Sequence, residues 1–408
     1  MKHKTTLASA GVLVVVLIAG FTIALAGPLA QDGFSRFENS WPATDFSQAS
    51  VDASEIFSGG PPPDGIPPYY PEGYTYPNQV PSPLEEGAAP AFTVNYTDFE
   101  TTDTYLPDEQ QVISVEIDGD ARAYPLLLLN NHEIANTEVG GIPVAVTFCP
   151  LCNASVVFDR RIENRTLHFG VSGLLRNSDL IMWDHETLTW WQQFTGEAIV
   201  GTLTGTMLET IPSVVVSYGE FKAQHPDGQV LFNDQRNYDP NRVSYQGYDV
   251  TGDPFLFRGE VDDRLFATER VLGYFGSEGA IAYPLSTLAE TVAVNDMIGA
   301  EPVTVLWQPG SRSLFSETET GSAALFERTL EDGTVLTFTV EDETTIVDEQ
   351  TGSTWNVFGA ATSGELEGTQ LEKLTAHPHF WFAWAAFRPD TLLWEPGMVA
   401  DEAWAEQE

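Results

Sequence analysis

The residues of this 408-residue sequence that could do chemistry lie around its two cysteines. Cys149 and Cys152 are spaced C-x-x-C with a proline between them, and the apolar residues 144–148 lead into the first of them. His132 and Glu133 lie upstream of the pair. Two thiols, an imidazole and a carboxylate are the residue types of a redox pair or of a metal site.

Dithiol redox chemistry is one reading of this region. C-x-x-C spacing brings two sulfurs close together and can lower a thiol pKa from about 8.5 to below neutral. One of Cys149 and Cys152 would then attack and the other resolve, with His132 or Glu133 tuning the attacking thiol. A thioredoxin-type pair opens a helix, however, whereas residues 153–158 have the pattern of a strand, which weakens that analogy.

A metal site is the second reading. The thiolates of Cys149 and Cys152 and the imidazole of His132 would form a three-ligand set with one open position. Soft ligands of this kind suit copper or zinc. A third reading is a local disulfide between the two cysteines that only braces a loop. The sequence leaves the three readings open.

A polar segment downstream could line the same site. Asn177, Ser178 and Asp179 are followed by Asp184, and their side chains could lie at the mouth of a cysteine site. The same residue types favour bends of the chain. We interpret Asp184 as structural, because Asp348 accompanies it in a later, similar segment.

Comparing the chain with itself indicates an internal duplication. Residues 121–152 align without a gap with residues 280–311, and the shared positions are glycines, prolines and apolar residues that specify backbone and core. The chemical residues of the first segment are not kept: their counterparts are Thr291 for His132, Val292 for Glu133, Gln308 for Cys149 and Ser311 for Cys152. We therefore expect the first copy to hold a site and the second to be structural.

Short alternating runs separated by turn residues predict an α+β, β-rich fold with two tandem copies of a sandwich- or barrel-like domain. No G-x-G-x-x-G or P-loop sequence indicates a nucleotide-binding fold. The expected divisions are residues 1–30 (membrane anchor or signal segment), 31–92 (Pro/Gly-rich tether), 93–234 (first repeat), 235–263 (connector) and 264–400 (second repeat).

The N-terminus predicts export. Lys2, His3 and Lys4 precede an uncharged apolar stretch, residues 7–26, which is long enough to cross a bilayer. We expect a retained membrane anchor, with a cleaved signal peptide as the alternative. Either places the body outside the cytoplasm. The proline- and glycine-rich residues 31–92 should form a flexible spacer. A few aromatic residues of this spacer could dock on the folded body.

The charge is extreme. Acidic residues number 59 against 18 lysines and arginines, which gives a formal net charge of −41. An acidic, lysine-poor surface fits a halophilic protein, because concentrated salt screens its self-repulsion. The same charge argues against nucleic acid or anionic lipid as a partner.

Several segments resemble the DUF3179 family, a group of exported proteins of unknown function. They are Asp118-Gly-Asp-Ala-Arg-Ala-Tyr-Pro-Leu, His132-Glu133-Ile134, Pro143-Val-Ala-Val-Thr-Phe-Cys-Pro-Leu-Cys, Phe169-Gly-Val-Ser-Gly-Leu-Leu and Gln193-Phe-Thr-Gly-Glu-Ala. The resemblance implies a site at Cys-Pro-Leu-Cys and names no reaction. We thus expect a membrane-tethered, extracytoplasmic protein with thiol-redox or copper/zinc chemistry at Cys149, Cys152, His132 and Glu133. The alternative is a non-catalytic surface binding or scaffold protein, so whether the protein is an enzyme stays open.

Overall fold

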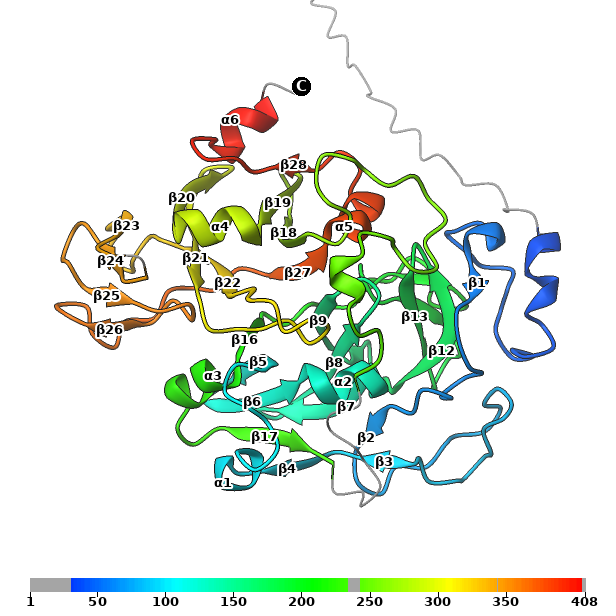
Figure 1. The fold of residues 1–408 in the computed structure, drawn as a ribbon. Helices are drawn as coiled ribbons and strands as arrows, with labels where there is room; N and C mark the ends of the chain where they lie inside the picture. The colour runs from blue at the N-terminus through cyan, green and yellow to red at the C-terminus, as the bar shows by residue number, and fades with distance from the viewer. Residues whose placement is uncertain (1–30, 234–242, 343, 406–408) are drawn as a thin grey trace, which may run out of the picture.

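The computed structural model describes residues 31–233, 243–342 and 344–405. Its secondary structure is mostly strand, arranged in several open sheets with short helices between them, and no sheet closes into a barrel within these residues (Figure 1). The β-rich class expected from the sequence is therefore confirmed. The six α-helices of the described residues are α1 (Phe99–Thr102), α2 (Leu126–His132), α3 (Tyr218–Gln224), α4 (Leu285–Thr291), α5 (Trp381–Phe387) and α6 (Ala400–Ala405).

Three sheets of the first half of the body position the cysteines. The first has the order β16 (Val214–Ser217), β5 (Gln111–Ile117), β6 (Asp120–Pro125), β17 (Gln229–Phe232), β4 (Asn95–Thr97). The second has the order β3 (Phe92–Thr93), β2 (Tyr69–Tyr70), β7 (Ile134–Val139), β8 (Ile142–Cys149), β9 (Ala154–Asp159). The third has the order β1 (Phe57–Ser58), β12 (Phe169–Arg176), β13 (Asp179–Asp184), β14 (Trp190–Gln192), β15 (Ala198–Val200), and β10 (Arg161–Ile162) pairs with β11 (Arg165–Thr166).

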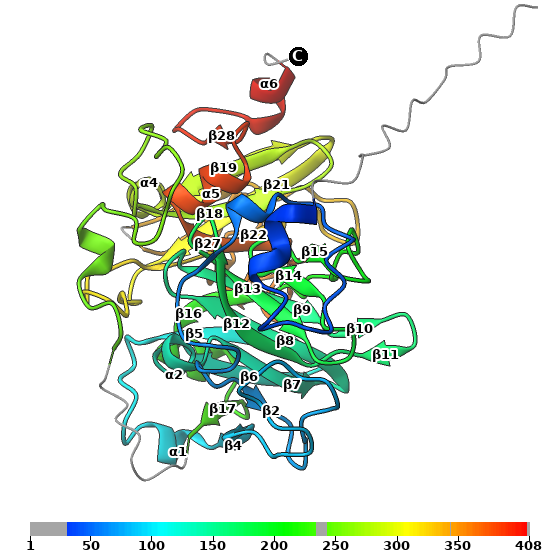
Figure 2. The same cartoon turned by 90° about the vertical axis from the view of Figure 1, so that its right-hand side faces the viewer.

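The strands of the second half pair in a corresponding order. One sheet is β27 (Ala376–Phe380), β18 (Arg270–Phe275), β19 (Ala280–Pro284), β28 (Leu392–Leu393). The next is β20 (Ala293–Ile298), β21 (Glu301–Gln308), β22 (Ser322–Glu327), and the last is β23 (Phe338–Val340), β24 (Ile346–Asp348), β25 (Thr354–Trp355), β26 (Ala361–Ser363). In two perpendicular views these sheets lie over those of the first half (Figures 1 and 2).

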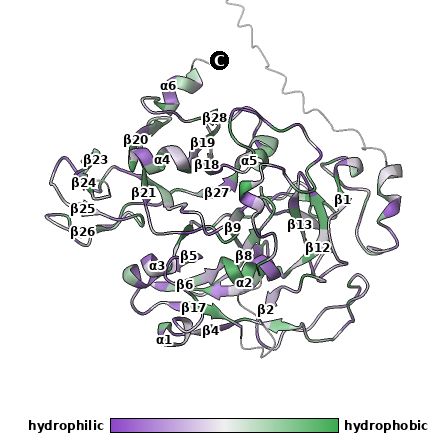
Figure 3. Ribbon diagram, in the orientation of Figure 1, coloured by the Kyte–Doolittle hydropathy of each residue, from purple (hydrophilic) through white to green (hydrophobic). Residues whose placement is uncertain are grey.

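Local sequence explains several of these elements. The β5–β6 hairpin turns at Asp118 and Gly119, whose φ angles of 51° and 82° are those of a tight hairpin turn. Helix α3 begins with a capping box, in which the Ser217 side chain accepts from Glu220 N and the Glu220 side chain accepts from Ser217 N. Hydrophobic residues concentrate on the strands and on α2, and peripheral loops are hydrophilic (Figure 3).

Residues 31–92 do not behave as the flexible spacer expected from their composition. Phe34, Trp41 and Ile56 are buried in a small hydrophobic core with Trp183 and Trp190 of the third sheet. The strand β2 of this segment pairs in parallel with β7. The segment is thus part of the folded body, because its aromatic residues bury enough apolar surface to order the proline-rich chain between them.

The larger hydrophobic core runs through both halves, and includes Phe148 and Val157 of the first and Leu306 and Phe380 of the second. The stretch expected to anchor the chain, residues 7–26, lies outside the described residues. Within the part of the chain that the structure describes, no helix has the length and apolar character needed to cross a membrane.

Candidate metal centre

The two cysteines flank a tight turn between paired strands. Cys149 ends β8, and its Cα pairs with that of Ala154 at the start of β9. Between them the chain reverses through residues 150–153, where Asn153 adopts a φ of 49°. Cys149 is 2% exposed and Cys152 is fully buried. The turn therefore holds both thiols on the inside of the protein, next to each other.

Asp179 completes the group. Its carboxylate lies with the two sulfurs in a set whose ligand atoms are all within 4.8 Å of one another. Asn177 and Ser178, both with positive φ, form the turn that delivers Asp179 to the start of β13. The thiol of Cys149 donates to Ser178 O at 3.7 Å, and that of Cys152 to Asn177 O at 3.9 Å.

The Asp179 carboxylate is only half satisfied by the protein. Its Oδ2 accepts from Gln192 Nε2 at 2.6 Å and from Phe194 N at 2.9 Å. Its Oδ1 accepts from no N–H or O–H group among the described residues, although it is buried. A buried carboxylate oxygen without such a partner is costly. A cation beside the sulfurs would satisfy it.

Glu133 lies within electrostatic reach of this group. It follows α2 directly, with a φ of 57°, and its backbone is fixed by Glu133 N donating to Leu129 O and Phe148 N donating to Glu133 O. Burial and, to a lesser extent, the charge of Asp179 together raise the pKa of Glu133 to about 8. In turn, the charges of Asp179 and Glu133 add to the burial that raises the pKa of Cys149.

His132 lies elsewhere. Although it adjoins Glu133, it is not in the group of three ligands. Its Nδ1 donates to Pro67 O at 2.7 Å, and its ring packs on Tyr69 and Phe92 at centroid distances of 4.4 and 4.5 Å. Burial lowers its pKa to about 4. The imidazole expected to be a ligand instead fixes the N-terminal segment to α2.

Burial also decides the protonation of the group. It raises the pKa of both thiols and raises the pKa of Asp179 to about 7. Two thiols and two carboxyls buried together without a cation resist ionisation, since each negative charge opposes the next. The arrangement does not produce the low thiol pKa of a redox cysteine. Nor are the cysteines joined: both are free, contrary to the structural disulfide considered from the sequence.

The connector and the second half enclose the group. Tyr248 Oη donates to Leu151 O at 3.1 Å and accepts from Phe255 N at 3.1 Å. Ser178 Oγ donates to Phe255 O at 2.7 Å. From β27, Phe380 N donates to Cys152 O at 2.8 Å. The cysteine turn is thus held from both sides, and the connector between the halves covers the site.

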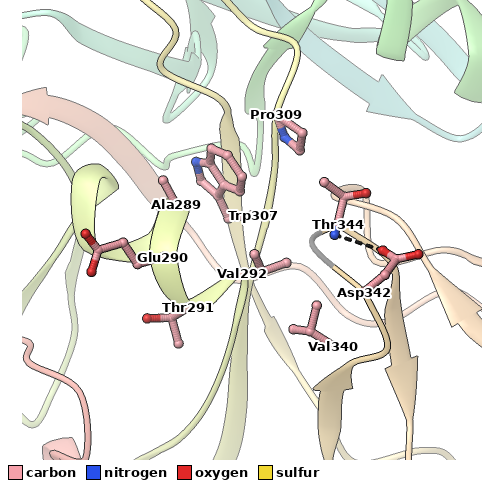
Figure 4. A pocket seen from close by; sticks show the side chains of 9 residues that line it. All are labelled: Ala289, Glu290, Thr291, Val292, Trp307, Pro309, Val340, Asp342 and Thr344. Carbon is pink, nitrogen blue, oxygen red and sulfur yellow. Dashed lines mark hydrogen bonds between the residues drawn. The ribbon is translucent and has the colours of Figure 1, made fainter.

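In the second half, an open cavity of about 450 Å³ lies beside the end of α4, lined by nine residues that include neither Gln308 nor Ser311 (Figure 4). Thr291 and Val292 line it, together with Trp307 of β21 and Pro309, which follows the end of that strand (Figure 4). Gln308, at the position of Cys149, accepts from Val357 N at 2.8 Å through its side chain. These side chains include no thiol or imidazole.

The sequence singles out Cys149, Cys152 and Glu133 as site residues, and the structure groups the two cysteines with Asp179, a candidate ligand that the sequence did not single out. Asp179 was considered only as a possible lining residue within a bend-forming segment. One signal could have singled it out: it stands directly before the apolar run Leu180-Ile-Met-Trp, where a carboxylate is buried with its strand. Buried carboxylates without a basic partner are unusual outside functional sites.

Together these features define a β-rich protein with a buried group of two thiols and a carboxylate. The chain belongs to the DUF3179 family, described as protein of unknown function, whose match covers residues 88–391. Neither the curated proteins nor the solved structures include a match to the chain. The match spans both halves of the body, and the family description names no reaction.

Proposed function

We propose that this protein binds a transition metal through Cys149, Cys152 and Asp179. The observation that carries the proposal is the convergence of two thiols and a carboxylate within 4.8 Å in a buried place. Two thiolates and one carboxylate form a mixed soft and hard set, which suits Zn²⁺ better than Cu⁺, a softer ion. Glu133 lies within electrostatic reach of the group and would act on it through its charge.

The metal would compensate the charges that burial otherwise opposes. Binding of a divalent cation deprotonates thiols and carboxyls that are neutral in the metal-free protein. The enclosure by the connector would slow exchange of the ion. A structural site with protein ligands at every position is closed in this way, and a catalytic one keeps an open position.

Metal analysis of protein purified without chelator tests the proposal. The expected result is one zinc or copper per chain, lost in Cys152→Ser and kept in Ser311→Ala, which alters the corresponding position of the second half. No bound metal in the parent protein, even after zinc is added under reducing conditions, would reject the proposal. Equal loss of metal in both variants would show that the metal does not bind at the cysteine turn.

Dithiol redox chemistry is the second candidate, and one observation favours it: the two thiols are adjacent and free. In that case Cys149 and Cys152 would form a disulfide reversibly at a mild potential, in protein that binds no metal. Thiol trapping across a series of redox buffers distinguishes the two. If the protein is instead a scaffold, Cys149→Ser/Cys152→Ser should change neither the metal content of the protein nor the phenotype of the host cell.

We also propose that the protein is anchored in a membrane by residues 7–26, with its body outside the cytoplasm in a salt-rich medium. The apolar stretch behind a basic N-terminus supports the anchor, and the net charge of −41 supports the salt. Fractionation of the host cells tests the first. Far-UV circular dichroism that reaches full folded signal only at molar salt is expected for the second, and full folding in dilute buffer would contradict it.

Finally, we propose that the two halves are copies of one unit. The corresponding strand orders support this, and so does a shared hydrogen-bond motif. Asp184 accepts from Thr187 N at 2.6 Å and from Trp191 Nε1 at 2.8 Å. Asp348 accepts from Thr351 N at 2.6 Å and from Trp355 Nε1 at 3.0 Å. The equivalence makes the second half a natural control for the first.

A further inference from the structure

A second cluster of chemically capable side chains lies where the N-terminal segment meets the third sheet. Asp64, Tyr70 and Tyr76 come from the segment, and His185 follows β13 directly. All four are buried, with Asp64, the least covered of them, 9% exposed. Nothing in the cysteine site uses these residues, and the second half has Glu349 in place of His185 when Asp184 is aligned with Asp348.

Their donor atoms converge around one carboxylate oxygen. Asp64 Oδ2 accepts from Tyr70 Oη at 2.8 Å and from Tyr76 Oη at 3.1 Å. His185 Nε2 lies 3.1 Å from Tyr70 Oη and 3.9 Å from Asp64 Oδ2. Two ligand atoms bound at about 2.0–2.1 Å and at right angles in an octahedron lie about 2.9 Å apart. Three of the observed separations, 2.8, 3.1 and 3.1 Å, are close to that spacing, and the fourth, from His185 Nε2 to Asp64 Oδ2, is longer at 3.9 Å.

The atoms behind these donors hold them in place. Asp64 Oδ1 accepts from Val171 N at 2.9 Å and from Trp183 Nε1 at 3.4 Å, which turns Oδ2 toward the tyrosines. The other nitrogen of His185, Nδ1, is hydrogen-bonded to Tyr74 Oη. Metal-binding histidines almost always donate their second ring N–H to such a partner. Burial lowers the pKa of His185 well below its usual value, so the ring is neutral at neutral pH and one of its two nitrogens carries a lone pair. Binding through Nε2 requires the tautomer with its proton on Nδ1.

We propose that Asp64, Tyr70, Tyr76 and His185 form a second metal site, for a hard trivalent cation such as Fe³⁺. Binding would form two iron–phenolate bonds, one iron–carboxylate bond and one bond to His185 Nε2, and the two phenol protons would pass to solvent. One carboxylate and two phenolates carry three negative charges, which balance Fe³⁺ in a buried place where net charge is costly. No electron is transferred in this step.

The donor set decides which class of cation fits. It contains no sulfur, so it does not suit the soft ions that cysteines select. Ca²⁺ and Mg²⁺ take oxygen ligands, chiefly carboxylates, carbonyls and water, and a histidine nitrogen is foreign to such a set. Three of the four ligands lie on residues 64–76 and one on the body, so a bound ion would cross-link the N-terminal segment to the third sheet.

Titration of the full-length protein with a ferric chelate tests the proposal, with a parallel sample refolded in its presence so that burial does not prevent entry. The expected result is one Fe³⁺ per chain with a visible tyrosinate-to-iron charge-transfer band. The band should be kept in Cys149→Ser and in Tyr124→Phe, which alters a buried tyrosine elsewhere. It should fall at least tenfold in Tyr70→Phe and in Tyr76→Phe.

Three results would overturn the proposal. They are the absence of binding in both samples, iron bound by surface carboxylates without the band, and a band that survives in Tyr70→Phe/Tyr76→Phe. In each case the cluster is a hydrogen-bonded clamp and no more. If the tyrosine variants do not fold, resonance Raman spectroscopy of the iron-treated parent protein decides instead, because phenolate ring modes enhanced through the visible band appear only when tyrosine binds the metal.

Discussion

The end of α2 in the first half and the end of α4 in the second have the same backbone and different side chains. Glu133 and Val292 both follow the helix at positive φ, 57° and 65°. Each donates its N–H four residues back, and each carbonyl accepts from the strand that leads to the cysteine position, at 2.8 Å in both cases. A β-branched residue at positive φ is a genuine outlier, yet the second half keeps it without any ligand nearby.

The comparison separates scaffold from chemistry. A strained backbone beside a cysteine site would by itself suggest a functional device. Because Val292 shares the positive φ, the strain at Glu133 does not depend on a neighbouring cysteine site. What distinguishes the first half is the chemical content, namely two thiols and two carboxyls, and the connector that covers them. Four predictions test this difference.

The largest expected effect is on metal affinity. Asp179→Asn keeps the shape of the side chain and removes its charge, so zinc affinity should fall at least about 100-fold, more than loss of an outer residue usually costs. Glu133→Gln should reduce it by about tenfold, since Glu133 lies beside the group of three. Competition with a chromogenic chelator measures both. Unchanged affinity in Asp179→Asn would remove the carboxylate from the site.

The next effect concerns stability and should be equal in the two halves. Asp184→Ala leaves one backbone N–H and an indole N–H without an acceptor. Asp348→Ala leaves the N–H of Thr351 and an indole N–H without one, and the N–H of Ser353 keeps only Thr351 Oγ1 as its acceptor. Each substitution should lower the free energy of unfolding by about 2 kcal/mol. Urea denaturation in saturating salt measures both. A large loss in one variant and none in the other would contradict the equivalence of the halves.

A third effect depends on pH. The pKa of Asp179 is raised to about 7 and that of Glu133 to about 8, chiefly by burial. A carboxyl with a raised folded-state pKa stabilises the protein while protonated, and that stability is lost as pH rises from its unfolded value of about 4 through the folded value.

Metal-free protein should therefore lose thermal stability between about pH 5 and 8, and Asp179→Asn should flatten this slope. Zinc should reverse this change of thermal stability with pH. The metal displaces protons, so it binds about tenfold more tightly per pH unit for each proton released. Melting curves with zinc and with chelator measure both slopes. A metal-free protein whose melting temperature rises across this range would contradict the account.

The smallest expected effect is on the rate of metal exchange, and it tests whether the connector over the site limits that rate. Tyr248→Phe removes the hydroxyl that joins Leu151 O to Phe255 N, a contribution of about 1 kcal/mol. The connector should then open more often, and a chelator should remove the metal a few times faster at unchanged affinity. Tyr274→Phe, on β18 of the second half, is the matched control. Equal rates in the two variants would show that the connector does not limit exchange.

Sequence patterns predicted the β-rich class, which the structure confirms, because strand alternation depends on residues close together in the chain. The place of the site at the cysteines stays a prediction. Asp179 escaped prediction because it reaches the cysteines only when β13 packs beside the β8–β9 turn, which is a tertiary contact. His132 and Glu133 are neighbours, but the helix α2 ends between them and Glu133 has a positive φ, and their side chains have different surroundings. Similarly, no local sequence pattern shows that aromatic residues of the segment 31–92 are buried in a hydrophobic core with residues of the third sheet.

X-ray absorption spectroscopy of the zinc-loaded protein tests the central claim most directly. The account predicts two sulfur atoms at about 2.3 Å and one or two oxygen atoms at about 2.0–2.2 Å, with no imidazole scattering in the outer shells. A spectrum that requires a histidine ligand, or one without sulfur, would contradict a site made of Cys149, Cys152 and Asp179.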